Sequence, residues 1–376
     1  MAQQHLDPTD PMAESACGDA LAGYLRAQAT EFLRALRLHR ETGGDGGAPA
    51  RTKARAGDNG SQESVDAARA LRRSARRISA SLHTFRPLLD TDWSEAIRPE
   101  LAWLSGTLAM EHAYAARLER LLLALHRLSG AAVLPAQTGV PGDSADGTAD
   151  SRTAGDTRPP AHPAATVERG NLTVGAAKAG ALLERQLTLA RTRAHSSALQ
   201  ALGSSRFHAV ADNIAVLASE VPLTPAAATA DLRPLAGAAE ERLTDAVAAL
   251  PLVTAGNPYN AEALIHGLSP DPAPHPQDAP WHQVRLLLRL HRYAREVLHG
   301  DSAPVDVRLL AAGQALNRHR DASEAAAAAA QAARTPRIAP ATAYALGVLH
   351  ADQRHEVEAA RFAFQQSWQM QTVGTP

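Results

Sequence analysis

Most of the chain keeps apolar residues three and four positions apart, which is the spacing of helices that bury one face. Runs of β-branched residues with the alternation of a strand are almost absent. Alanine and leucine, both strong helix formers, dominate the apolar positions. The pattern predicts an all-α protein with helices over residues 14–39, 63–86, 95–131, 171–201, 205–220, 225–250, 281–299, 304–333 and 339–370.

Segments rich in Gly, Pro, Ser, Asp and Thr interrupt this pattern and predict flexible loops at 41–62 and 135–170. Residues 257–280 carry enough proline to separate two helices. The loop at 135–170 divides the chain into two unequal halves. The expected organisation is a disordered N-terminus over 1–13, a first half over about 14–134 and a second half over about 171–372.

The segment WHQVRLLLRLHRY, residues 281–293, combines positive charge with apolar surroundings. On a helix its basic side chains fall within an arc of about 80° that has apolar residues at both edges. They are His282, Arg285, Arg289 and Arg292. Buried like charges are costly without partners, and few acids lie nearby, so the pattern favours a polyanion as the missing countercharge. The alternative is a solvated helix face whose long stems lie on apolar neighbours.

A second basic stripe lies in the first half, where ARALRRSARRISASL (68–82) aligns without gaps on residues 281–295. The aligned pairs are Arg69 with His282, Arg72 with Arg285 and Arg76 with Arg289. Leu71, Ile78 and Leu82 form a separate apolar face in this copy, which favours the solvated alternative for it more strongly. Both copies nevertheless place basic residues at the same helical phase.

The overall charge excludes a general polyanion-coating protein, because 38 Lys+Arg are balanced by 39 Asp+Glu and the formal net charge is -1. Any anion site must come from locally concentrated charge. Nearly all basic residues are arginine, with lysine only at Lys53 and Lys178, although a GC-rich genome produces the same bias. The N-terminus does not have the pattern of a signal peptide, and no apolar run approaches the ~20 residues of a membrane span, so a cytoplasmic protein without a membrane partner is expected.

Catalysis is not expected. Cys17 is the only cysteine, which leaves no disulfide or thiolate metal site, and no Gly-rich phosphate loop or acidic cluster at metal-ligand spacing occurs. His350 and His355 are spaced too far apart for one helix face, so residues 350–358 are expected to be solvated. Aromatic residues do not alternate with the arginines, which disfavours sequence-specific nucleic-acid binding. No metal and no cofactor are expected.

The order of these helices resembles the CHAD domain (conserved histidine α-helical domain) over most of residues 14–372. Family members repeat a helix of the form V-H-x-x-R-x-x-x-[KR]-R-L-R in each half. WHQVRLLLRLHRYAREVL (281–298) is similar to the second copy, and ARALRRSARRISASLHTFRPLL (68–89) to the first. The opening, middle and closing segments of the family resemble residues 18–33, 181–218 and 343–368. No single motif is specific, but the order and spacing of all five are.

The resemblance implies two four-helix bundles related by pseudo-twofold symmetry, with a basic cleft between them. It also implies non-catalytic, electrostatic binding of inorganic polyphosphate, and a cytoplasmic location that can include polyphosphate granules. The binding candidates that it implies are Arg69, Arg72, Arg76 and Arg77 in the first half and His282, Arg285, Arg289 and Arg292 in the second. Weaker candidates are His83, Arg185, Arg191 and Arg193.

The first copy departs from the family pattern, since Arg69 stands where the histidine belongs and Ser79 where arginine is usual. In the second copy Leu290 replaces a basic residue. The Arg-Asp pair that follows the third helix is kept as Arg320-Asp321 in the second half but reads His112-Ala113 in the first. These changes dilute the positive charge and leave a second hypothesis open, in which a degenerate member serves as a helical scaffold or protein-interaction module with weak or no polyphosphate binding.

Overall fold

The computed structural model describes residues 11–43, 53–130, 163–257, 268, 275–300 and 305–369. Within these residues the chain forms α-helices and short 3-10 turns, and the only strand-like pairing is an isolated bridge between Leu89 and Leu223. The α-helices of the first half are α1 (Pro11–Gly43), α2 (Lys53–Thr84) and α3 (Thr91–Leu128). Those of the second half are α4 (Pro163–Leu202), α5 (Ser205–Ser219), α6 (Arg233–Ala248), α7 (Leu252–Ala255), α9 (Ala279–His299), α10 (Val307–Ala333) and α11 (Pro340–Gln369). The all-α prediction is confirmed.

Several helices begin inside segments that were expected to be loops. α2 starts at Lys53, within the expected loop at 41–62, because Lys, Ala, Arg, Gln and Glu keep helix propensity between its glycines. α4 starts at Pro163, within the expected loop at 135–170, and proline suits the first turn of a helix because no N–H is needed there. The remainder of both loops, at 44–52 and 135–162, lies outside the described residues, as do residues 1–10 and 131–134.

The expected helix over 225–250 is shorter in the structure. Pro225–Ala228 forms only a 3-10 turn, and α6 then begins at Arg233 with Pro234 in its first turn. Other helix starts are capped as the sequence allows: the side chain of Asp90 accepts a hydrogen bond from the Trp93 N–H at the start of α3, and Asp306 does the same for Leu309 at the start of α10.

Buried apolar residues form three clusters. The first joins α1, α2, the start of α3 and α5 through residues such as Phe32, Phe85 and Phe207. The second joins α6, α9, α10 and the end of α11, around Trp281 on α9 and Phe364 on α11. The third joins the end of α3 to α4, α10 and α11, so α3 connects the two halves of the sequence. The pairing into two pseudo-twofold bundles stays a prediction.

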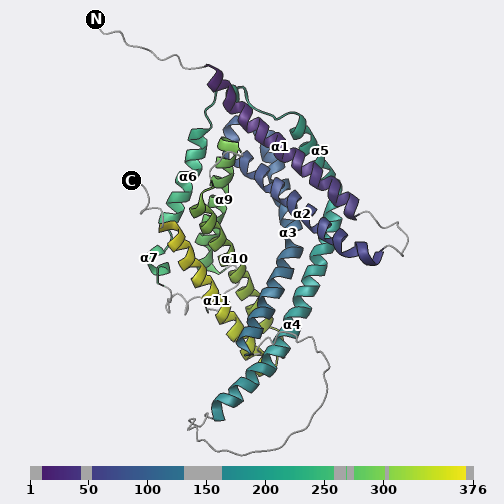
Figure 1. Ribbon diagram of the computed structural model, residues 1–376, viewed down its shortest axis with the longest axis vertical. Coiled ribbons are helices and arrows are strands. Elements are labelled where there is room, and N and C mark those ends of the chain that lie inside the picture. The colour runs from purple at the N-terminus through teal and green to yellow at the C-terminus, as the bar shows by residue number, and fades with distance from the viewer. Residues whose placement is uncertain are drawn as a thin grey trace, which may run out of the picture.

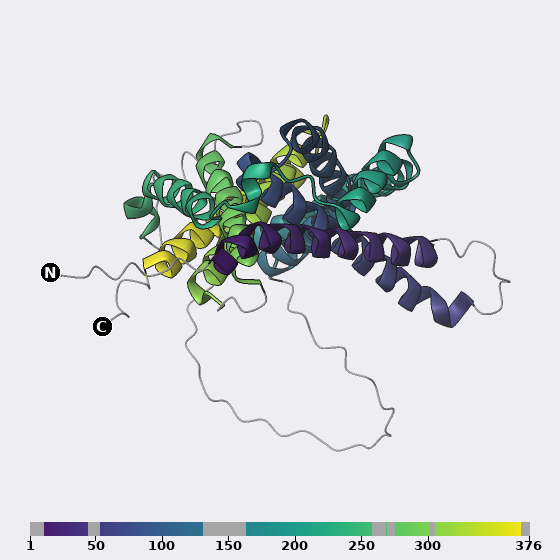
Figure 2. The ribbon, with the colours of Figure 1, turned by 90° about the horizontal axis from the view of Figure 1, so that it is seen from above.

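The helices spread out at one end of the molecule and converge at the other (Figure 1). α1 and α5 lie on one side and α6 and α9 on the other, and α3, α4, α10 and α11 meet at the lower end of the view. Seen from above, α1 runs from side to side across the view (Figure 2). α2 packs directly on α9, which places the two basic segments next to each other. In the described part of the chain, no helix has both the length and the apolar character of a membrane span.

Candidate anion-binding site

Five arginines from three helices come together between the two halves of the chain. We call them the arginine cluster: Arg72 and Arg76 on α2, Arg285 and Arg289 on α9, and Arg320 on α10. The repeated spacing of the sequence accounts for four of them, since Arg72 and Arg76 lie on α2, Arg285 and Arg289 lie on α9, and these two helices pack directly on each other. The structure therefore brings these four candidate residues together, and their role in anion binding stays a prediction.

Burial and mutual repulsion make this cluster electrostatically unfavourable without a ligand. Burial, and then the charges of Arg289, Arg320 and other neighbours, lower the pKa of Arg285 to about 9. Burial, Arg72 and Arg289 lower the pKa of Arg76 to about 10. Burial also lowers the pKa values of Arg72 and Arg289, and Arg320 adds to both shifts. The pKa values of Arg76 and Arg285 still lie above 7, so both side chains stay protonated at neutral pH, and the site concentrates positive charge in partly desolvated surroundings.

Few carboxylates offset this charge. No acid in the described part of the chain pairs with Arg72, Arg76 or Arg289. Arg285 donates from Nε to the Asn317 side-chain oxygen over 2.8 Å, which orients the guanidinium without neutralising it. Arg320 is the exception, because it pairs with the adjacent Asp321 and lies 3.9 Å from Glu324.

A cavity of about 380 Å³ opens beside the cluster between α2, α3 and α9. We call it the mixed pocket, because it combines polar and apolar walls. Its polar lining is Arg76, Arg289, Arg98, His83, Ser79 and Ser105. Its apolar lining is Ala80, Ala102, Leu286, Leu290 and Tyr293. Arg76 and Arg289 thus belong both to the cluster and to the wall of this pocket.

Three other predicted residues lie apart from the centre of the cluster. Arg77 donates to Glu296 over 2.7 Å and stacks on the Tyr293 ring, so its charge is already balanced. Arg69 influences Arg72 but pairs with Asp66 at 2.9 Å. Arg292 lines a separate pocket of about 180 Å³ together with Glu296 and Asp306. Their predicted roles in binding stay predictions.

The weaker candidates are also scattered. His83 lines the mixed pocket, but its Nδ1 lies 3.1 Å from a guanidinium nitrogen of Arg98, and burial followed by that charge lowers the pKa of His83. An imidazole that accepts this bond is neutral. The three α4 candidates, Arg185, Arg191 and Arg193, are exposed, and Arg191 lies 3.7 Å from Glu111. None of the three lines the mixed pocket.

His282 lies between the cluster and a buried polar network. Burial lowers its pKa, Asp278 opposes this shift and Arg285 adds to it. Its ring meets the His319 ring edge to face, with centroids 5.5 Å apart. Its Nε2 is buried and has no hydrogen-bond partner in the described part of the protein. The buried Nε2 atom of His282 is therefore available for a hydrogen bond next to the arginine cluster.

Asp278, at the start of α9, is the centre of that network. Its carboxylate accepts from Arg354 at 2.7 Å and from Arg361 at 2.7 Å, both on α11, and from the Ser323 hydroxyl on α10. Gln353, Arg354 and Val357 are buried, which corrects the expectation that residues 350–358 are solvated, and Arg361 is buried as well. Burial of Arg354 is possible because the fully buried Asp278 pairs with it, while Arg361 shares the Asp278 carboxylate and also pairs with Glu358 at 2.7 Å.

Two residues, Arg320 in the cluster and His112 near it, are absent from the sequence-based candidates. Arg320 acts on the pKa values of Arg72, Arg76, Arg285 and Arg289, and its Arg-Asp dipeptide was a signal that could have identified it. His112 on α3 has a lowered pKa because of burial and the charges of Arg69 and Arg72. In the described residues, no three His, Cys, Asp or Glu side chains are arranged to hold a metal ion.

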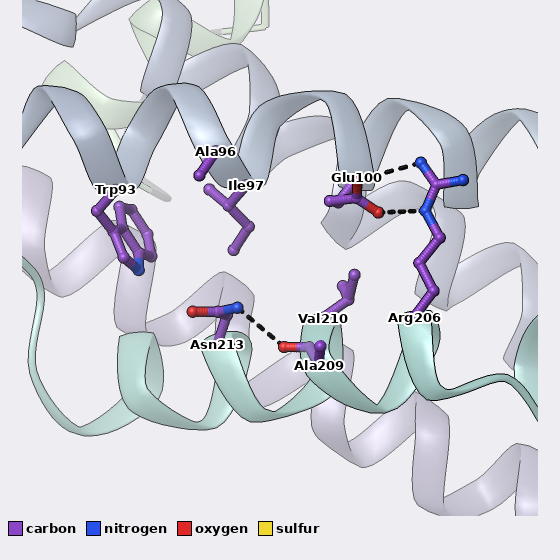
Figure 3. A pocket seen from close by; sticks show the side chains of 8 residues that line it. All are labelled: Trp93, Ala96, Ile97, Glu100, Arg206, Ala209, Val210 and Asn213. Atoms are coloured by element: carbon purple, nitrogen blue, oxygen red, sulfur yellow. Dashed lines mark hydrogen bonds and ion pairs between the residues drawn. The ribbon is translucent and has the colours of Figure 1, made fainter.

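A smaller pocket of about 150 Å³ between α3 and α5 has a different character (Figure 3). Its one arginine, Arg206, makes two hydrogen bonds to the Glu100 carboxylate, and its guanidinium lies 4.1 Å from the centroid of the Trp103 ring. Asn213 bonds to the Ala209 backbone oxygen. The charge of Arg206 is balanced by Glu100, whereas Arg72, Arg76 and Arg289 of the arginine cluster have no carboxylate partner in the described part of the chain.

Comparison with known proteins gives two matches that cover most of the chain. The family model described as the CHAD domain matches residues 48–330. The solved structure of PptA from Streptomyces chartreusis is 69% identical, and the match covers 94% of this chain and 99% of that one with a TM-score of 0.70. No curated protein matches the chain.

Proposed function

The chain belongs to the CHAD domain family, and from this premise we propose that it binds inorganic polyphosphate by electrostatic capture, without catalysing a reaction. The observation that supports the proposal most directly is the arginine cluster, in which Arg72, Arg76 and Arg289 have no acidic partner among the described residues. A chain of phosphates supplies the countercharge that the protein omits. Binding in the cytoplasm, including at polyphosphate granules, is part of this proposal.

Polyphosphate fits the chemistry of the cluster better than a single small anion. Arginine donates two parallel hydrogen bonds to phosphate oxygens, and five guanidiniums on three helices offer successive contacts to a linear ligand. In the free protein the neighbouring arginines repel one another. Each bound phosphate reduces this repulsion, which favours binding.

The proposal is tested by reversing two charges in the cluster. Arg285→Glu with Arg289→Glu removes two contacts and adds two repulsive groups, so we expect the affinity for long-chain polyphosphate to fall at least about a hundredfold. Isothermal titration calorimetry at one fixed salt concentration measures the change. Circular dichroism checks that the helices are intact.

The matched control is Arg26→Glu with Arg233→Glu, which changes the net charge equally at two exposed positions on α1 and α6. We expect its affinity to stay within about threefold of wild type, because exposed charges far from the ligand are screened by salt. Wild-type affinity in the cluster variant would contradict the site. No measurable binding by wild type would instead favour the scaffold hypothesis that the altered first copy leaves open.

A further inference from the structure

The mixed pocket has a property that a linear polyphosphate does not use. Leu286, Leu290 and Tyr293 give it an apolar wall from α9, while Ala80 and Ala102 extend that wall on α2 and α3. Leu286 remains 46% exposed, a large apolar side chain left uncovered beside charged groups. Polyphosphate is hydrophilic along its whole length, so contact with this apolar wall adds no favourable binding free energy.

The same pocket is continuous with cationic groups that do suit phosphate. Arg76 and Arg289 line it and belong to the arginine cluster, and neither pairs with a carboxylate of the described chain. A ligand that fills both regions must join a phosphate chain to a compact body with apolar faces. The cavity volume of about 380 Å³ lies in the range of pockets that hold small molecules.

Polar side chains of α2 and α3 add hydrogen-bonding capacity to the lining of the pocket. Ser79 on α2 is partly exposed, and the Ser105 hydroxyl on α3 donates to the Ala102 carbonyl and keeps its lone pairs free. His83 lies at the same wall, held by Arg98. A flat heterocycle with polar edges complements this arrangement, because its faces pack on leucine and tyrosine while its edges reach the hydroxyls.

We propose that the mixed pocket binds the nucleoside part of a nucleoside polyphosphate whose phosphates contact Arg76 and Arg289. The phosphate contacts rest on the proposed function, whereas the nucleoside contacts are additional to it. The site then takes two ligand classes, free polyphosphate and nucleotides with several phosphates, which compete for the same two arginines.

The test compares ATP with inorganic tripolyphosphate in metal-free buffer, using calorimetry and the full chain. Both ligands have three phosphates, and tripolyphosphate carries at least as much negative charge, so charge alone cannot favour ATP. We expect ATP to bind about tenfold more tightly, which is the scale of one base packed on apolar and aromatic side chains. ATP binding no tighter than tripolyphosphate overturns the proposal.

A variant that fills the mixed pocket tests whether the preference for ATP over tripolyphosphate arises there. Ala102 is exposed, so the larger side chain of Ala102→Trp can occupy the pocket without entering a buried core. We expect this variant to lose the preference for ATP over tripolyphosphate. We expect its affinities for tripolyphosphate and for long-chain polyphosphate to change by less than about threefold. Ala215→Trp, at an exposed position on α5, is the control and retains the preference. Ser79→Phe fills the pocket from α2 and provides the same test if Ala102→Trp does not fold.

The outcomes separate the two proposals. If long-chain polyphosphate binds but ATP shows no advantage, the pocket proposal fails and the proposed function stands. If Ala102→Trp weakens all three ligands alike, the pocket belongs to the phosphate path and the nucleoside proposal also fails. If polyphosphate does not bind while ATP binds more tightly than tripolyphosphate, the proposed function fails and the nucleoside pocket stands.

Discussion

At the scale of single residues, the strongest interactions surround Asp278. Burial alone pushes the pKa of Asp278 upward, but the hydrogen bonds and the positive charge of Arg354 outweigh burial and hold it below its usual range. The Arg361 Nε donates to His319 Nε2 at 3.3 Å, so a neutral His319 carries its proton on Nδ1, which is buried without a partner in the described chain. Trp281 stacks on the same ring. This packing keeps His319 uncharged.

His319 gives stability a defined pH dependence. Burial is the main cause that lowers its pKa to about 4, whereas an unfolded histidine titrates near 6.5. The unfolded chain therefore takes up a proton as the pH falls below about 6.5 while the native chain does not, and stability is lost between about pH 6.5 and pH 4. For this residue alone, we expect a loss of about 2 kcal/mol between pH 7 and pH 5.

Urea unfolding of wild type and His319→Gln at pH 7 and pH 5 measures this effect. Glutamine keeps an acceptor for Arg361 but does not titrate, so the stability of the variant should depend less on pH by about 2 kcal/mol. The buried His291 is present in both proteins and cancels in the comparison. An identical pH dependence in the two proteins would contradict a neutral, buried His319.

At the scale of elements, close helix packing depends on small residues. α10 packs against α11 through buried alanines such as Ala325 and Ala329. α4 approaches α11 at Gly175, where an added Cβ would lie 2.1 Å from the Ala341 carbonyl oxygen. The two backbones are thus too close for a Cβ atom at position 175, so the position where these helices cross depends on glycine.

Gly175→Ala is expected to destabilise the protein by roughly 1–3 kcal/mol, because α4 or α11 must shift. Gly347→Ala on α11 is the matched control: nothing lies within 4 Å of its added Cβ, and alanine should stabilise the helix by roughly 0.5–1 kcal/mol. Thermal unfolding monitored by circular dichroism distinguishes the two. A neutral Gly175→Ala variant would show that the two helices are not held at this separation.

Helix positions could be predicted well from the sequence because apolar spacing and caps are local signals. The expected helix at 281–299 and the observed Ala279–His299 differ only at the start. The starts of α2 and α4 were missed because glycine and proline were read as loop signals, although helix formers continue past the glycines of α2 and proline opens α4. The crossing at Gly175 is a tertiary contact and has no local signature.

At the scale of the whole molecule, packing of α2, α9 and α10 creates a site that no single helix contains. The repeated spacing predicted Arg72, Arg76, Arg285 and Arg289. It did not predict Arg320, since that residue reaches the cluster only through the packing of α10. Nor could the sequence show that Glu296 neutralises Arg77, because the two lie 219 positions apart. The type and spacing of charged residues can be read from a short stretch of sequence, whereas the ion-pair partner of each residue depends on the tertiary fold.

The salt dependence of binding to long-chain polyphosphate tests the central claim, that the arginine cluster captures the ligand by charge. Affinity is measured by titration at 50 and 200 mM salt. For about five phosphate contacts, counterion release predicts that wild-type affinity falls about a hundredfold between the two conditions, and that Arg285→Ala with Arg289→Ala shows a clearly smaller fall. Equal wild-type affinity at both salt concentrations, or an unchanged salt dependence in the variant, would contradict the account.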